Sequence, residues 1–122
     1  GRKLKILFSG IPNIRLLDPI YDVQTLSLYR ANCDSYVHGH SAGGTNPSLV
    51  EMMHFDKPVI AFDCVFNRAT TEGNGLFFDT TTSLINIISD SESLVESGKL
   101  FEVAQRRYTW EIVRDQYLAL FN

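Results

Sequence analysis

The residues best suited to chemistry in this chain stand together at positions 38–51, which read HGHSAGGTNPSLVE. The stretch combines histidines and hydroxyl side chains with consecutive glycines, and it ends in a carboxylate. Backbone amides that converge at a glycine-rich turn can bind a phosphate, and a carboxylate can accept hydrogen bonds from ribose hydroxyls. These residue types predict an anion site beside a hydroxyl-binding group. An ordinary turn between a strand and a helix is the alternative interpretation, because glycine-rich turns before helices are common.

The start of the helix that would present this site follows from its first residues. Pro47 lacks a backbone N–H and has a fixed φ, so it suits the first helical position and makes Asn46 the N-cap. The small residues at positions 43–45 let the backbone bend and turn its amides toward one point. Glu51 then lies one helical turn inside, where it could accept ribose hydroxyls. A solvated helix residue is the alternative interpretation of Glu51.

The histidines and Ser41 of this stretch, and Trp110 further along the chain, could each take part in another kind of chemistry. His38 and His40 alternate, so in an extended strand they share a face and could ligate a metal. No third ligand stands at a recognisable spacing, so we expect a hydrogen-bonded pair at the strand end, with His40 the better ligand contact. Ser41 has no paired His–Asp arrangement, which disfavours a nucleophilic hydrolase. Trp110 is interpreted as a packing residue.

A second group of polar residues follows the predicted strand Val59–Phe62. Asp63, Asn67 and Arg68 stand beyond its carboxyl end, the edge at which open α/β sheets collect ligands. Arg68 could approach a phosphate or a sugar there, or it could be an exposed loop arginine. No G-x-G-x-x-G follows a strand, which argues against a dinucleotide-binding enzyme.

The elements that would position these groups alternate between strands and helices, so the predicted fold class is α/β, a parallel sheet flanked by helices. We expect strands at Tyr36–His38 and Val59–Phe62, and two earlier strands at Lys5–Phe8 and Asn13–Leu17. Parallel neighbours need a crossover of a dozen or more residues, which the chain between these two early strands does not provide. Either the two early strands are not parallel neighbours, or part of their connection is missing between Gly10 and Ile11. We favour a missing connection.

Three helices besides the one at Pro47 are expected. Asp22 can cap a helix over residues 23–31 with one buried stripe, formed by Val23, Leu26 and either Tyr29 or Arg30. Threonines 80–82 can cap a helix over residues 83–89. Its residues Leu84, Ile85, Ile87 and Ile88 should face inward. A single long helix is predicted over residues 99–121.

Composition limits the function classes. The 122 residues and 13.8 kDa fit one domain, and the net charge of −3 with a pI near 5.5 argues against broad binding of nucleic acid or membrane surfaces. No apolar run approaches the roughly 20 residues that a membrane span needs, and no signal peptide is recognisable, so we expect a cytoplasmic protein. Cys33 and Cys64 are isolated in the sequence, so we expect free thiols.

Several motifs resemble the C-terminal, donor-binding domain of GT-B glycosyltransferases of family 4. The resemblance is clearest over residues 36–61, where Glu51 takes the place of the family's second Glu and KPVIA matches the following strand. Downstream, EGNGLFF at residues 72–78 resembles the family's DGxNGLLF segment, and residues 108–121 resemble its C-terminal tail. The resemblance implies a Rossmann-like sheet, the C-terminal half of a GT-B fold.

The motif HGHSxGGTNPSLxE is similar to one found in bacterial transferases that build O-antigen or capsule, including rhamnosyl- and N-acetylhexosaminyl-transferases. This similarity implies a role in lipopolysaccharide biosynthesis. It further implies a retaining reaction that uses a UDP- or dTDP-sugar donor and needs no metal or other cofactor. The acceptor would be a lipid-linked saccharide, so the expected location is the cytoplasm, peripheral to the inner face of the plasma membrane. Nucleic acid is not an expected partner. The donor-binding residues so implied are His40, Ser41, Gly43, Gly44, Thr45, Asn46 and Glu51, with His38, Asn67 and Arg68 as further candidates.

The chain departs from the family pattern in two places. The family's first Glu, which contacts the donor sugar, falls on Gly43. Its Arg and Lys phosphate clamp has no convincing counterpart, because Arg2 and Lys3 stand too close to the start of the chain to take that place. We expect a fragment that lacks the N-terminal acceptor domain, binds weakly and turns over little. A non-catalytic nucleotide- or phosphate-binding module of the same fold is the alternative.

Overall fold

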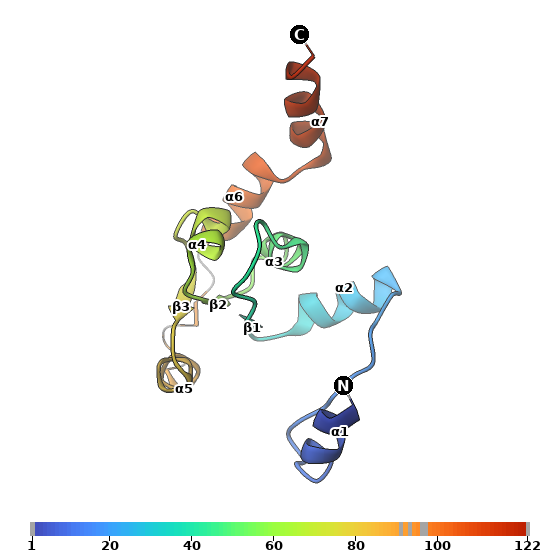
Figure 1. The fold of residues 1–122 in the computed structure, drawn as a ribbon, viewed down its shortest axis with the longest axis vertical. Coiled ribbons are helices and arrows are strands. Elements are labelled where there is room, and N and C mark those ends of the chain that lie inside the picture. The colour runs from blue at the N-terminus through green and yellow to red at the C-terminus, as the bar shows by residue number, and fades with distance from the viewer. Residues whose placement is uncertain (1, 91, 93, 96–97, 122) are drawn as a thin grey trace.

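The computed structural model describes residues 2–90, 92, 94–95 and 98–121, and it is organised around a three-stranded parallel sheet (Figure 1). The strands are β1 (Tyr36–His38), β2 (Val59–Phe62) and β3 (Leu76–Phe78), in the order β1-β2-β3. Val37 pairs with Ile60, which pairs with Leu76. The parallel sheet flanked by helices confirms the predicted α/β class.

Two helices connect the strands and pack above the sheet with a third. Helix α3 (Pro47–Met53) joins β1 to β2, α4 (Val65–Thr71) joins β2 to β3, and α6 (Lys99–Arg107) packs against α3. Alternate residues of β2 point to the same face of the sheet, so Val59 and Ala61 both pack with residues of α3 and α6. The buried cluster consists of Leu49, Met52, Met53, Val59, Ala61, Leu100, Val103 and Ala104.

Four further helices complete the described structure. They are α1 (Arg2–Phe8), α2 (Val23–Asn32), α5 (Thr81–Ser89), which packs against β3, and α7 (Trp110–Ala119). Asp22 caps α2 by accepting a hydrogen bond from the Thr25 amide, as predicted. The longest of the described helices have 10 residues, and none of them is long and apolar enough to cross a membrane.

The two early strands were predicted wrongly. Residues 2–8 form α1, and residues 13–17 have no regular secondary structure. A short apolar run such as KILF fits a helix as well as a strand, and the described sheet offers no neighbour with which it pairs. Lys5 instead forms an ion pair with Asp18, so this segment closes on itself. Because neither segment is a strand, no crossover connection between them is needed.

Two predicted buried stripes are only partly covered. Helix α2 has no fully buried residue: Leu26 and Arg30 are half-buried, whereas Val23 and Tyr29 are exposed. In α5, Leu84 and Ile87 are half-buried, but Ile85 and Ile88 are exposed. A 3.6-residue period identifies one face of a helix, but it does not show whether another element covers that face.

The single C-terminal helix was also predicted wrongly, because the chain bends between α6 and α7. Helix α6 ends at Arg107, and Tyr108 caps it by donating its amide to the Ala104 carbonyl at 2.8 Å. Thr109 then has extended backbone and caps α7, with its side chain accepting from the Ile112 amide at 3.5 Å. A capping threonine inside an apolar pattern therefore divides one predicted helix into two.

The outer helices give the molecule a large surface. The accessible area is 8907 Å², whereas a compact monomer of 13.8 kDa would have about 6,600 Å². Figure 1 shows α1, α2 and α7 extending away from the sheet. The folded core is therefore confined to β1–β3, α3, α4 and α6, which are the elements that also carry the predicted site.

Candidate functional site

The loop of residues 39–46 lies at the carboxyl end of β1 and leads directly into α3. Asn46 has extended backbone, and its side-chain oxygen accepts a hydrogen bond from the Ser48 amide at 3.0 Å. Pro47 is the first residue of the helix. The predicted strand, loop, cap and helix start are all confirmed. His40, Ser41, Gly43, Gly44 and Thr45 are all exposed in this loop.

The backbone conformation at position 43 favours glycine, although a side chain would have space there. Its φ is +86°, a left-handed conformation, and a Cβ at this position would meet nothing within 4 Å. Residues with a side chain adopt such a φ only at a cost. A glutamate could therefore replace Gly43 only if the loop changed shape, so the departure from the family pattern involves the loop conformation as well as a missing carboxylate.

Asn67 holds the loop against the sheet. Its side chain is buried, with 3% exposed, and Nδ2 donates to the carbonyl of His40 and to that of Phe62, both at 2.9 Å. One amide thus ties the loop after β1 to the end of β2. The structure places this candidate beside the loop as a positioning residue, a role that the sequence did not reveal.

The two histidines have different environments. His38 is 4% exposed, and its Nδ1 lies 3.1 Å from the hydroxyl of Tyr36, whereas Nε2 has no partner among the described residues. Burial, and to a lesser extent His40, lowers the pKa of His38. His40 is exposed, with its ring centroid 6.2 Å from that of His38. The hydrogen-bonding partner of His38 is therefore Tyr36 rather than His40.

No metal centre is evident in the part of the chain that the structure describes. Among those residues, His, Cys, Asp and Glu side chains do not form any group of three or more that could hold an ion. Cys33 and Cys64 are both free thiols.

Glu51 lies on the exposed side of α3, near the loop. Its side chain is 53% exposed, and Oε2 accepts a hydrogen bond from Nη2 of Arg30 at 2.5 Å. Arg30 comes from the last turn of α2, so this ion pair joins α2 to the candidate site. Glu51 is therefore accessible to a ligand, with a guanidinium at one of its oxygens.

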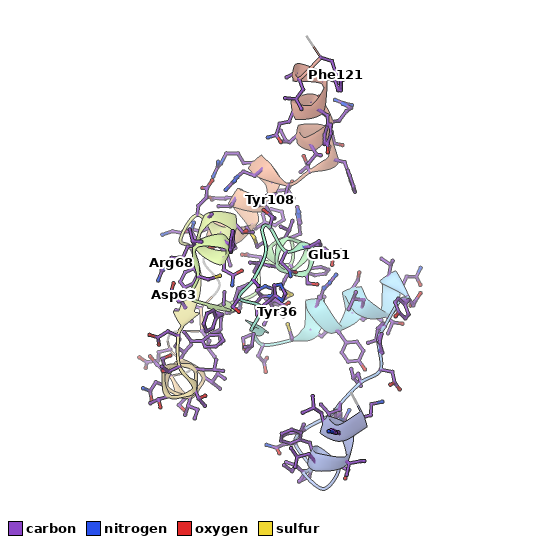
Figure 2. All side chains as sticks on the ribbon, viewed as in Figure 1. Tyr36, Glu51, Asp63, Arg68, Tyr108 and Phe121 are labelled. Atoms are coloured by element: carbon purple, nitrogen blue, oxygen red, sulfur yellow. The ribbon has the colours of Figure 1, made fainter. Side chains whose placement is uncertain are left out.

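Arg68 belongs to a separate group of residues. Its guanidinium makes two hydrogen bonds to Asp63, at 2.5 and 2.7 Å, and lies 4.2 Å from the ring centroid of Phe77. The hydrogen bond from Arg68 lowers the pKa of Asp63. Figure 2 shows Arg68 and Asp63 well apart from Glu51. The structure thus does not bring Arg68 together with the Glu51 carboxylate.

A groove of about 570 Å³ lies between α3 and the bend that joins α6 to α7. Thr45 and Glu51 line it on one side, and Tyr108, Trp110 and Glu111 on the other. Trp110 was expected to pack, but it is 86% exposed. Sequence reasoning missed the groove because it predicted one continuous helix here. The capping signal of Thr109 could have revealed the bend.

Comparisons with known proteins do not assign this chain to a family. Neither the protein-family models, the curated proteins nor the solved structures gave a match to this chain. The family resemblance therefore rests on the sequence motifs themselves.

Proposed function

We propose that this chain is the nucleotide-sugar-binding domain of a retaining glycosyltransferase that acts in the synthesis of a bacterial surface polysaccharide. The sugar donor would be a UDP- or dTDP-sugar. Backbone amides of residues 43–46 would receive the diphosphate, and Glu51 would accept the ribose hydroxyls. A lipid-linked acceptor would be bound by a second domain, at the cytoplasmic face of the membrane.

The observation that carries this proposal is the β1–loop–α3–β2 unit. Its loop stands at the carboxyl edge of a parallel sheet, where ligands of open α/β sheets bind. Asn67 fixes the loop to β2, and Gly43 gives it a turn that a larger residue would not favour. A loop held in place before the ligand arrives loses less entropy on binding.

A non-catalytic binding module remains the second candidate. It is favoured by the conformation of Gly43, since a loop shaped around a positive φ does not readily accommodate the sugar-contacting carboxylate of the family. Such a module would bind the nucleotide through the same amides and Glu51, but would have no group to contact the donor sugar at this position.

Titration of the isotope-labelled chain with UDP and dTDP, followed by amide NMR, tests the shared part of both candidates. We expect saturable shifts of the amides of residues 43–46, because Pro47 has no amide proton and the Ser48 amide donates to the side chain of Asn46. If neither nucleotide moves these amides, the nucleotide-binding proposal is wrong. Sugar transfer by this domain joined to an acceptor domain would then distinguish an enzyme from a binding module.

A further inference from the structure

The groove between α3 and the α6–α7 bend has the size of a ligand site. Its volume of about 570 Å³ falls within the range of roughly 300 to 1,000 Å³ that is usual for small-molecule pockets. Thr45 lines its edge and is also part of the loop that would receive the diphosphate. The groove is thus a continuation of the candidate site along the side of α3.

Both walls of the groove are held in place by contacts between elements. Nε2 of Gln105 on α6 lies 3.3 Å from Nδ1 of His54 at the end of α3. The hydroxyl of Tyr108 donates to the carbonyl of Thr70 on α4 at 3.0 Å. The bend is thereby fixed to the folded core, and it carries Trp110 at the first position of α7.

The charges that line the groove indicate which part of a nucleotide it suits. Its charged side chains among the described residues are Glu51 and Glu111, and neither lysine nor arginine contributes to the lining. Carboxylates repel a phosphate but accept hydrogen bonds from hydroxyl groups. Arg30 pairs with Oε2 of Glu51 from outside the lining, so the second oxygen of Glu51 can accept a hydroxyl, and Glu111 adds a further carboxylate. The groove therefore fits the uncharged, hydroxyl-bearing half of a nucleotide, and the phosphates belong in the loop beyond Thr45.

Trp110 gives this half a surface on which to stack. An indole is a large apolar group, yet 86% of Trp110 is exposed at the side of the groove. Nucleobases stack on such rings without depending on base identity. The ring is offered by a bend that is anchored to the core, so little of its position would have to change on binding.

We infer that the groove takes the nucleoside half of the donor, with the ribose at Glu51 and the base stacked on Trp110. This inference rests on the proposed function and adds the direction in which the nucleotide lies. It also assigns a ligand contact to the C-terminal helix, which the sequence motifs do not place in the site.

Trp110 is the only tryptophan of the chain, so its fluorescence and its indole N–H signal report on the groove alone. Titration with UDP should quench the fluorescence and shift the indole signal together with the amides of residues 43–46. Inorganic pyrophosphate should shift the amides but leave the indole unchanged. Trp110→Leu should weaken UDP binding about tenfold, a typical effect of losing one stacked base, while pyrophosphate binding stays the same.

Tyr117→Leu is the matched control, since Tyr117 is an exposed aromatic residue of α7 that does not line the groove. It should leave UDP binding unchanged, and Trp110→Phe should restore most of the affinity. If UDP moves the loop amides without affecting Trp110, the inference is overturned and the proposed function stands. If UDP moves neither, both are overturned.

Discussion

Arg30 on α2 and Glu51 on α3 form an ion pair, with 2.5 Å between Nη2 and Oε2. The side chain of Glu51 is 53% exposed, so the pair itself contributes little stability. A carboxylate has two oxygens that can each accept more than one hydrogen bond. Arg30 can therefore pair with one oxygen of Glu51 while the other remains open to the hydroxyl of the proposed ligand.

Glu51→Gln should weaken the binding of UDP. The substitution keeps the shape of the side chain but removes the charge that strengthens a hydrogen bond from a ribose hydroxyl, so we expect about a tenfold loss of affinity. Isothermal titration calorimetry measures the change. An unchanged dissociation constant would remove Glu51 from the site.

Arg30→Gln is the control for this experiment, because it breaks the same ion pair and leaves the carboxylate intact. We expect its affinity for UDP to stay within about twofold of the wild-type value, since surface ion pairs contribute little. If Arg30→Gln weakens binding as much as Glu51→Gln, the ion pair rather than the carboxylate supports the ligand.

Asn67→Leu should destabilise the fold and loosen the loop. The change removes both hydrogen bonds of a buried amide, to the carbonyls of His40 and Phe62, and should cost about 2 kcal/mol of unfolding free energy. Urea denaturation measures the loss, and faster hydrogen exchange of the loop amides reports the loosening. Asn86→Ala, at an exposed position of α5, should show neither effect.

His38 should make the fold less stable in mild acid. Burial lowers its pKa in the folded state below the usual value of 6.5, so the unfolded chain binds the proton more readily. The stabilisation from an uncharged His38 is therefore complete above pH 6.5 and is lost as the pH falls through the folded pKa. Unfolding free energies measured between pH 7.5 and pH 5 should decrease accordingly.

Two substitutions separate His38 from the other titrating groups. His38→Phe should flatten this part of the pH profile, whereas His40→Gln should leave most of it in place, because burial is the larger cause of the lowered pKa of His38 and His40 the smaller. Parallel profiles for wild type and His38→Phe would show that some other group causes the acid sensitivity.

The central unit could be predicted because its signals are local. Asn46 and Pro47 define a helix start within two adjacent positions, and the flanking strands are short apolar runs bounded by turn residues. Asp22 identified α2 in the same way. The interactions that hold the candidate site together are not local in the sequence. Arg30–Glu51 and Asn67–His40 join residues far apart in the chain, and no local pattern identifies them.

The errors arose where one pattern fits two structures. Residues 5–8 are apolar enough for a strand, but four such residues do not distinguish a strand from a helix. Residues 99–121 keep a helical period throughout, so the bend at Thr109 was hidden. Two elements, β3 and α4, were not predicted at all, and α4 begins without a side-chain cap that would have marked its start.

Removing residues 1–21 should change the stability of the core very little. The described part of this segment interacts within itself, through Lys5 and Asp18 and through a hollow shared by Phe8, Ile14 and Leu16. We expect the unfolding free energy to stay within about 0.5 kcal/mol of the full chain, as for changes remote from a core. Urea denaturation provides the comparison, and a loss several times larger would place the segment in the core.

Gly43→Ala should destabilise the fold, and Gly44→Ala should not. A Cβ finds open space at both positions, so only the backbone distinguishes them: Gly43 has a φ of +86°, whereas Gly44 does not have a positive φ. The left-handed conformation should cost Gly43→Ala about 1 kcal/mol, while Gly44→Ala should be neutral or slightly stabilising. Urea denaturation of the two variants tests the difference, and equal stabilities would contradict it. Gly43→Glu should carry the same cost, so restoring the carboxylate of the family pattern would also disturb the loop that is proposed to receive the diphosphate.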